Sequence, residues 1–317
     1  MKKLFAALIA VLLSGLINLA QAQNESNYLC FKAVGGDASF GIENNGVYDY
    51  PEIEFSYDRN NWEPMESGVY YSLNNSQKVY LRGENRKISH DYYGDQYTRF
   101  IMTGQIAASG SVMSLLDNGT GTLNEVSERD CFTKLFLDCT SLTQAPELPA
   151  MSVSENGYHN MFNGCTSLTK APEIPATDMN LLSCEAMFAN CTSLVEGPSV
   201  LYASAPFCYE GMFSGCINLT KAPKLPNQWV SWGCCNAMFA GCTSLETAPE
   251  LPAEYLADQC YSCMFNGCSS LKYVKVHFTD WNDANYSTKD YYYDSDKAGK
   301  GGCITLHLKE LSYVPKT

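Results

Sequence analysis

The sequence of 317 residues predicts a two-part fold, in which an N-terminal all-β, sandwich-like domain precedes a solenoid of short parallel strands and short helices. Residues 28–108 alternate apolar and polar side chains between turn-rich segments, as half-buried strands do. Residues 109–276 repeat about every 26 residues, and units of this length stack into one elongated core. We therefore expect a sandwich-like domain at 23–108, about six repeats at 109–276 and a C-terminal cap at 277–317.

The N-terminus has the features of a cleavable signal peptide, predicted at residues 1–22. Two lysines precede an uncharged apolar run from Leu4 to Ala20, and Ala20-Gln21-Ala22 matches the small-x-small pattern that signal peptidase cleaves. An N-terminal membrane anchor is the alternative, but the run is short and no basic flank follows it. The mature chain is expected to begin near Gln23 and to contain no membrane span.

The predicted location is therefore outside the cell, either secreted or at the cell surface. The first cysteine, Cys30, does not follow a lipobox, so the signal peptide is not that of a lipoprotein. A hydrophobic fraction of 45% indicates a folded chain. The net charge is −13, and loss of Lys2 and Lys3 with the signal peptide leaves −15. Such a chain repels phosphate backbones, so neither nucleic acid nor an anionic bilayer is an expected partner.

The first domain is predicted from five apolar-polar alternations separated by Gly- and Asn-rich turns. Residues 56–62 (Ser-Tyr-Asp-Arg-Asn-Asn-Trp) resemble an Asp-box hairpin, in which Asp58 would close the turn by accepting backbone hydrogen bonds. An Asp-box is a structural element, so no catalytic role follows from it. The five predicted strands are 28–33, 53–57, 69–73, 79–82 and 100–106.

The repeats carry three aligned columns of apolar side chains. Phenylalanine precedes each repeat cysteine by three residues, and leucine follows it by three. Because a unit this short cannot bury its own side chains, stacking should align the columns into a buried ladder. The columns are Phe136, Phe162, Phe188, Phe213, Phe239 and Phe265; Cys139, Cys165, Cys191, Cys216, Cys242 and Cys268; Leu142, Leu168, Leu194, Leu219, Leu245 and Leu271.

Each repeat is predicted to contain a short strand, a proline corner and a short helix, as at 260–265. Proline cannot donate to a ladder, so the strand should end near the alanine before it. Residues 110–118 resemble a degenerate first repeat that caps the stack. The residue before each repeat cysteine belongs to the set that tolerates a left-handed backbone and ends helices: Asp138, Gly164, Asn190, Gly215, Gly241 and Gly267.

Segments 242–253 (Cys-Thr-Ser-Leu-Glu-Thr-Ala-Pro-Glu-Leu-Pro-Ala) and 260–268 (Cys-Tyr-Ser-Cys-Met-Phe-Asn-Gly-Cys) resemble the repeats of the BspA-like leucine-rich-repeat surface proteins of Bacteroidales. The resemblance covers about residues 110–276. It implies a leucine-rich-repeat-like solenoid and a role in adhesion to host proteins or other bacteria. The proline corner distinguishes this sequence from family members with shorter repeats. The resemblance therefore does not predict the curvature of the solenoid.

Fifteen cysteines in an exported chain invite disulfides, and the odd count leaves at least one thiol unpaired in each monomer. The six repeat cysteines are expected to be reduced and buried, as free cysteine usually is. Pairing Cys208 with Cys216 across a helical segment would span about 12 Å, whereas a disulfide needs less than about 7 Å. Any disulfides should therefore join neighbouring repeats through a second column, Cys131, Cys208, Cys234 and Cys260, and its neighbours Cys184, Cys235 and Cys263.

No sequence motif indicates catalysis, a metal or a cofactor, and we expect a protein that is not an enzyme. Zinc binding at Cys260 and Cys263 is disfavoured by export and by the lack of a second CxxC pair. Calcium binding at Asp290, Asp294 and Asp296 departs from the EF-hand pattern. The histidines, His90, His159, His277 and His307, are scattered.

One column of exposed residues follows the short strands and forms a candidate binding face. Its variation among repeats suits either recognition or simple solvation. The first function hypothesis is an adhesin-like protein that binds a surface or extracellular-matrix protein through this face. The alternatives are a carbohydrate-binding accessory protein, which would use the N-terminal β domain to bind a glycan, and a purely structural role. The candidate residues are Gln144, Lys170, Glu196, Lys221, Thr247 and Tyr273.

Overall fold

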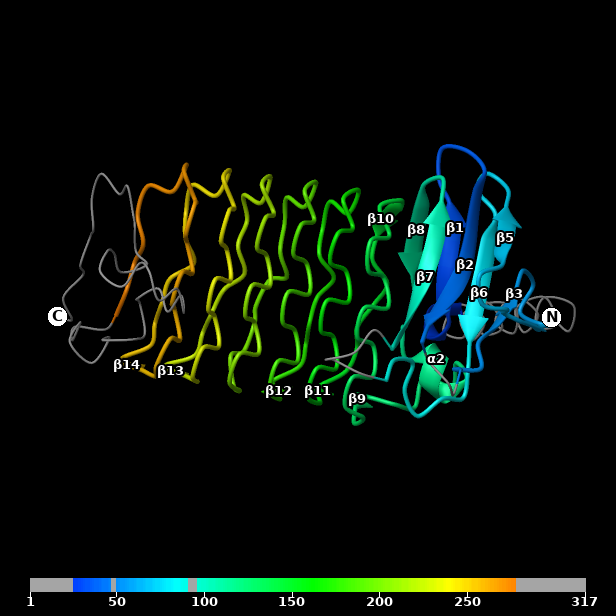
Figure 1. The fold of residues 1–317 in the computed structure, drawn as a ribbon, viewed down its shortest axis with the longest axis horizontal. Coiled ribbons are helices and arrows are strands. Elements are labelled where there is room, and N and C mark those ends of the chain that lie inside the picture. Colours follow the sequence, from blue (N-terminus) through cyan, green and yellow to red (C-terminus); the bar gives the residue numbers. More distant parts are fainter. Residues whose placement is uncertain (1–24, 47–49, 91–95, 278–317) are drawn as a thin grey trace, which may run out of the picture.

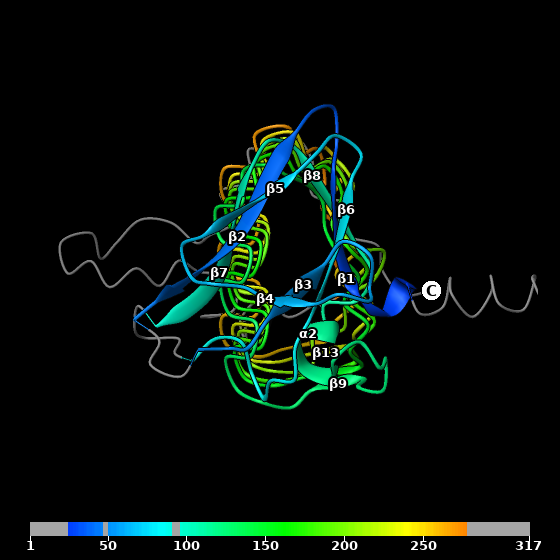
Figure 2. The same cartoon turned by 90° about the vertical axis from the view of Figure 1, so that its right-hand side faces the viewer.

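The computed structural model describes residues 25–46, 50–90 and 96–277 (Figure 1). The predicted signal peptide lies outside these residues, as does nearly all of the predicted C-terminal cap. The described chain forms a sheet-rich N-terminal end from which coils stack in one direction. Viewed along the stack, successive coils superimpose (Figure 2).

The N-terminal end contains two sheets. One has the strand order β10-β8-β1-β6-β3-β4 and the other β5-β2-β7. The pairs are antiparallel except β10–β8, which is parallel. The strands are β1 (Leu29–Ala33), β2 (Ala38–Asn45), β3 (Glu54–Ser56), β4 (Glu63–Pro64), β5 (Tyr70–Leu73), β6 (Lys78–Arg82), β7 (Tyr97–Thr103), β8 (Ile106–Ser109) and β10 (Leu142–Gln144).

The repeats and the N-terminal strands share one core, so the two-part fold prediction is wrong. Strand β10 belongs to the first full repeat and extends the sheet of β8, with Leu142 opposite Ile106. The rings of Phe31 and Phe100 lie 5.0 Å apart, and the ring of Phe100 lies 5.1 Å from that of Phe136. The N-terminal sheet therefore continues directly into the repeats.

The first coil begins with β7 and β8 and continues into residues 110–112, which pair with Glu147, so the 26-residue period predicted only its last part. Phe100 donates its N–H to the carbonyl oxygen of Leu135, and Phe100 lies in the phenylalanine column. The offset to Phe136 is 36 residues because an insertion precedes the next coil. This insertion contains the four-residue helix α2 (Ser114–Asp117), whose Leu115 and Leu116 are buried against the end of the stack.

Short parallel strands mark one corner of the coils. They pair in the orders β12-β11-β9 and β13-β14, and Ser152 of β11 lies between Glu125 and Asp178. Figure 1 places this corner along the lower edge of the stack. The strands are β9 (Glu125–Val126), β11 (Ser152–Val153), β12 (Asp178–Met179), β13 (Trp229–Val230) and β14 (Tyr255–Leu256).

The predicted helices are absent from residues 118–277, so the fold class with short helices is wrong. Residues 260–265 form turns in place of the predicted helix. In each coil, alternate N–H groups bond three residues back, as from Met187 to Cys184, and the others bond to the neighbouring coil, as from Phe188 to Met212. A helix would direct all of these groups within its own segment. The observed architecture is a stack of turn-based coils joined by backbone hydrogen bonds.

A left-handed residue recurs every fourth position along these turns. In the coil of Phe188 the residues are Leu182, Ala186 and Asn190, with φ of 57°, 49° and 59°. The last of them precedes the repeat cysteine, as predicted, because Gly and Asn tolerate this backbone. The other two columns hold mixed residue types, so they carried no recognisable sequence signal.

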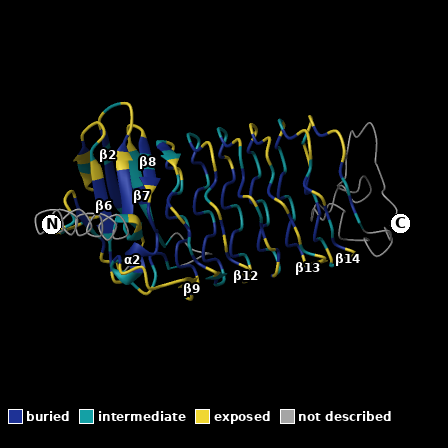
Figure 3. Ribbon diagram, turned by 180° about the vertical axis from the view of Figure 1, so that it is seen from behind, coloured by how far each residue is buried: buried dark blue, intermediate teal, exposed yellow. Residues whose placement is uncertain are grey.

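Most residues of the repeat columns are buried, and buried segments recur along each coil (Figure 3). The phenylalanine rings stack in parallel: Phe162 and Phe188 are 5.4 Å apart with an interplanar angle of 2°, and Phe188 and Phe213 are 5.7 Å apart with an angle of 7°. Offset parallel stacking of this kind is a favoured arrangement of aromatic rings. The methionines before the phenylalanines are also buried: Met161, Met187, Met212, Met238 and Met264.

Candidate binding surface

The predicted binding face forms a ribbon on the outside of the stack. Parallel bridges place Lys170 beside Glu196 and Glu196 beside Lys221, and another places Thr247 beside Tyr273. Gln144 lies at the end of β10, next to the first coil. The structure thus brings the second, third and fourth of the six candidates together in one ladder, and the fifth and sixth together in a separate pair. We call the six residues Gln144, Lys170, Glu196, Lys221, Thr247 and Tyr273 the ribbon.

In the middle of the ribbon, one carboxylate is shared by two lysines. A carboxylate oxygen of Glu196 lies 3.0 Å from Nζ of Lys170, and the other lies 3.0 Å from Nζ of Lys221. These hydrogen bonds lower the pKa of Glu196, and the bond to Glu196 raises the pKa of Lys170. Exposed ion pairs of this type contribute little stability. They place the three charged side chains next to one another on the surface of the stack.

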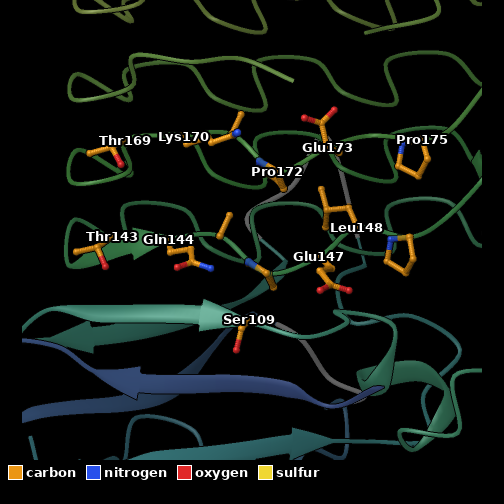
Figure 4. A pocket seen from close by; sticks show the side chains of 14 residues that line it. Ser109, Thr143, Gln144, Glu147, Leu148, Thr169, Lys170, Pro172, Glu173 and Pro175 are labelled. Atoms are coloured by element: carbon orange, nitrogen blue, oxygen red, sulfur yellow. The ribbon is translucent and has the colours of Figure 1, made fainter. Parts of the chain in front are cut away.

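A groove of about 570 Å³ opens at the N-terminal end of the ribbon. It lies between residues 143–149 of one coil and 169–175 of the next, and both Gln144 and Lys170 line it (Figure 4). Four prolines form much of its wall, namely Pro146, Pro149, Pro172 and Pro175. Sequence reasoning identified the proline corners but not the groove, because a space between two coils depends on how far apart they stack.

The repeat cysteines form a thiol ladder inside the stack. Each thiol donates a hydrogen bond to the carbonyl oxygen of a phenylalanine in the preceding coil, for example from Cys165 to Phe136 at 3.1 Å. Burial raises the pKa of Cys139 and of Cys191 to about 12, so both remain thiols at neutral pH. The other donors and acceptors are Cys139 to Phe100, Cys191 to Phe162, Cys216 to Phe188, Cys242 to Phe213 and Cys268 to Phe239.

The second cysteine column does not form the cross-coil disulfides considered above. Cys208, Cys234 and Cys260 are free and buried, as are Cys131, Cys184 and Cys235. Within one coil, the sulfurs of Cys234 and Cys235 are 3.6 Å apart and unbonded. Of the predicted set only Cys263 is disulfide-bonded. Within the described part of the chain every other cysteine is free.

A column of polar residues in the turn segments was not predicted from the sequence. In the central coils it contains His159, Glu185, Glu210 and Asn236, each three residues before the repeat phenylalanine. Nδ1 of His159 lies 3.4 Å from Glu185, and Nδ2 of Asn236 donates to Glu210 at 2.7 Å. Burial, together with repulsion from Glu185, raises the pKa of Glu210 to about 7. A fixed polar position in each repeat was the signal that could have revealed this column.

The Asp-box prediction agrees with the local geometry. One carboxylate oxygen of Asp58 accepts the backbone N–H groups of Asn60 and Asn61, both at 2.8 Å. These bonds, together with those from the Asn61 and Ser56 side chains, hold the pKa of Asp58 below its usual range. Asp58 therefore closes a turn, and both of its carboxylate oxygens accept hydrogen bonds within that turn.

Among residues 25–46, 50–90 and 96–277, no group of three or more His, Cys, Asp or Glu side chains is arranged to hold a metal ion. The calcium candidates Asp290, Asp294 and Asp296 lie outside these residues. Over the same residues, no helix has the length and apolarity needed to cross a bilayer. No protein-family model, curated protein or solved structure matches the chain.

Proposed function

We propose that this is an exported, adhesin-like binding protein, related to the BspA-like surface proteins, that recognises a host or bacterial surface macromolecule through the ribbon. The observation that carries the proposal is the registered ladder of Lys170, Glu196 and Lys221 on a stack held by backbone hydrogen bonds. Because the backbone that carries these side chains is held in register before binding, it loses little conformational freedom when a partner arrives. The groove beside Gln144 extends this surface with a concave, largely apolar part.

The test is binding of the mature chain to arrays of extracellular-matrix proteins, bacterial surface proteins and glycans. The ribbon variant Lys170→Ala/Glu196→Ala/Lys221→Ala removes the exposed ladder without touching the core. A matched control removes the same charges from the N-terminal end: Lys32 of β1 is exposed, and Lys78 of β6 forms an ion pair with Glu25, which precedes β1. The control variant is Glu25→Ala/Lys32→Ala/Lys78→Ala.

The proposal predicts that the ribbon variant loses binding to a protein on the array by about tenfold or more, while the control retains it. The opposite result, loss only in the control, would favour the alternative in which the N-terminal strands bind a glycan. If the unaltered chain binds nothing on any array, both binding functions are contradicted and a structural role is favoured.

A further inference from the structure

Two exposed tryptophans mark the corner of the stack at β13. Trp229, the first residue of β13, is 68% exposed, and Trp232, three residues later, is 51% exposed. Figure 1 places this corner along the lower edge of the stack, away from β10 and the ribbon. Large apolar side chains that gather on a surface mark interaction sites. The strands β9, β11 and β12 of the same corner begin instead with polar residues, namely Glu125, Ser152 and Asp178.

Trp232 is supported by the preceding coil. The ring of Phe207 lies 4.9 Å from the ring of Trp232 at an interplanar angle of 60°, and the N–H of Phe207 donates to the carbonyl oxygen of Trp232 at 3.0 Å. Gly233 leaves room for the Phe207 ring, because a Cβ at Gly233 would lie 2.1 Å from one of its carbons. The indole is therefore packed on one side and open to solvent on the other.

An exposed acidic residue of the next coil lies beside each tryptophan. The carbonyl oxygen of Asp258 accepts the N–H of Gly233, the residue after Trp232, at 2.9 Å. The N–H of Glu254 donates to the carbonyl oxygen of the residue before Trp229, at 3.3 Å. Both acidic residues are exposed. The backbone ladder thus sets one carboxylate next to each indole.

Charge is divided between the ribbon and this corner. Between Lys170 and Lys272 the sequence contains nine acidic and two basic residues, and the basic residues are Lys221 of the ribbon and Lys224 close to it. The ribbon carboxylate of Glu196 is paired with lysines. The corner therefore has a negative potential, which favours a cationic partner. Lysine and arginine are absent from the corner segments 176–186, 201–210, 225–236 and 251–262, which contain Asp178, Glu185, Glu210, Glu254 and Asp258.

We propose that Trp229 and Trp232, together with Glu254 and Asp258, bind an arginine-containing segment of a partner protein. We call these four residues the tryptophan corner. A guanidinium group over an indole face is attracted by the ring quadrupole, and tryptophan is the strongest aromatic partner for a cation. The planar guanidinium also stacks on aromatic rings while its N–H groups bond to a carboxylate. Tryptophan and arginine are also among the residues that dominate binding energy at protein interfaces.

This surface is separate from the ribbon, so the inference goes beyond the proposed function and does not depend on it. The experiment measures fluorescence anisotropy of labelled ten-residue peptides with the full mature chain. The probe alternates arginine and serine, and a second peptide replaces each arginine with citrulline, which has nearly the same shape but no charge. We expect the arginine peptide to bind and the citrulline peptide to bind about tenfold more weakly or worse.

Two variants test the location through the aromatic rings. Trp229→Leu and Trp232→Leu keep an apolar side chain but remove the indole. The matched control Tyr70→Leu removes an aromatic ring that is 52% exposed on β5, in the N-terminal sheet. Each tryptophan variant should weaken the arginine peptide about tenfold, and the control should not. Urea midpoints equal to that of the unaltered chain show that a variant is folded.

A third variant tests the carboxylate. Asp258→Asn removes the negative charge next to Trp232, and Glu147→Gln removes an exposed negative charge from the proline segment of a distant coil. The first substitution should weaken the arginine peptide several-fold and the second should leave it unchanged. Because both positions are exposed, neither substitution disturbs the core.

The inference is wrong if arginine and citrulline peptides bind equally, or if both tryptophan variants bind the arginine peptide as the unaltered chain does. It is also wrong if the ribbon variant alone loses the peptide, since the peptide would then lie on the ribbon. If the unaltered chain binds a glycan but no peptide, and Trp232→Leu abolishes glycan binding, the corner recognises a sugar and not arginine. Loss of array binding in the ribbon variant, with peptide binding retained, leaves both proposals standing.

Discussion

The thiol of Cys191 donates a hydrogen bond to the carbonyl oxygen of Phe162 in the preceding coil, at 3.1 Å. The ring of Phe162 stacks on that of Phe188, three residues before Cys191. Each repeat is therefore tied to its neighbour through two columns at once. Cysteine suits the position because it is small, is readily buried and carries a weak donor.

The thiol ladder should be unreactive in the folded protein. Burial raises the pKa of Cys191 to about 12 and that of Cys268, which is only partly buried, to about 11. Since the thiolate is the reactive form, iodoacetamide at pH 8 should leave Cys191 unmodified and label Cys268 first. Peptide mapping by mass spectrometry, with a fully denatured sample as control, provides the measurement. Disulfides among the six repeat cysteines would contradict the ladder.

The phenylalanine stack should dominate the stability of the central coils. Phe188 is fully buried, so Phe188→Ala removes a ring from between two others and leaves a cavity. We expect a loss of about 3–5 kcal/mol in the free energy of unfolding by urea. Val195→Ala, at a side chain that is 42% exposed, should change it by less than about 0.5 kcal/mol. Similar effects of the two substitutions would show that the stack is not the core.

The left-handed positions predict a stabilising glycine substitution. Ala237 has φ of 52°, a conformation that costs an L-residue about 1–2 kcal/mol. Glycine adopts it without that cost, so Ala237→Gly should raise the free energy of unfolding by about 0.5–1 kcal/mol after its larger loss of chain entropy. The control Ala240→Gly lies three residues on, without a positive φ, and should lower it by about 0.5–1 kcal/mol. A helical backbone through this segment would make both substitutions destabilising.

The buried carboxyl of Glu210 should make stability depend on pH. Its pKa is raised from 4.5 to about 7 in the folded state, so between these values the unfolded chain releases a proton that the folded chain retains. Stability is therefore lost as the pH rises from about 4.5 to about 7 and stays low above it.

Glu210→Gln removes this titration and keeps an acceptor for Asn236. Relative to the unaltered chain, it should gain stability at pH 8 and little at pH 4, as measured by urea midpoints at a series of pH values. The exposed control Glu125→Gln should follow the unaltered chain throughout. If the urea midpoints of both variants followed those of the unaltered chain at every pH, the raised pKa of Glu210 would be contradicted.

Part of this architecture could be read from the sequence. Apart from the partly buried Cys268, the Phe, Cys and Leu columns are buried, as their strict spacing predicted for stacked repeats. The left-handed residue before each cysteine followed from Gly164, Asn190 and their equivalents. These features depend on residue type at a fixed position, which is the information that a single sequence carries.

The rest depends on how the coils meet in space. Apolar residues every three positions suit a short helix and a chain of turns equally, and only the hydrogen bonds from Phe188 and its equivalents to the next coil distinguish them. The start of the first coil, at β7, was missed because the insertion containing α2 changes the offset from 26 to 36 residues. The groove arises from the separation of two coils, a property of neither alone.

The location of the binding surface is the central claim, and hydrogen–deuterium exchange of the full mature chain tests it directly. The measurement compares the free chain with the chain saturated by a protein that the array identifies. We predict slower exchange in the exposed segments of successive coils, at residues 142–147, 168–173, 194–199 and 219–224. Protection confined to β1–β8, with no change in these segments, would contradict the account.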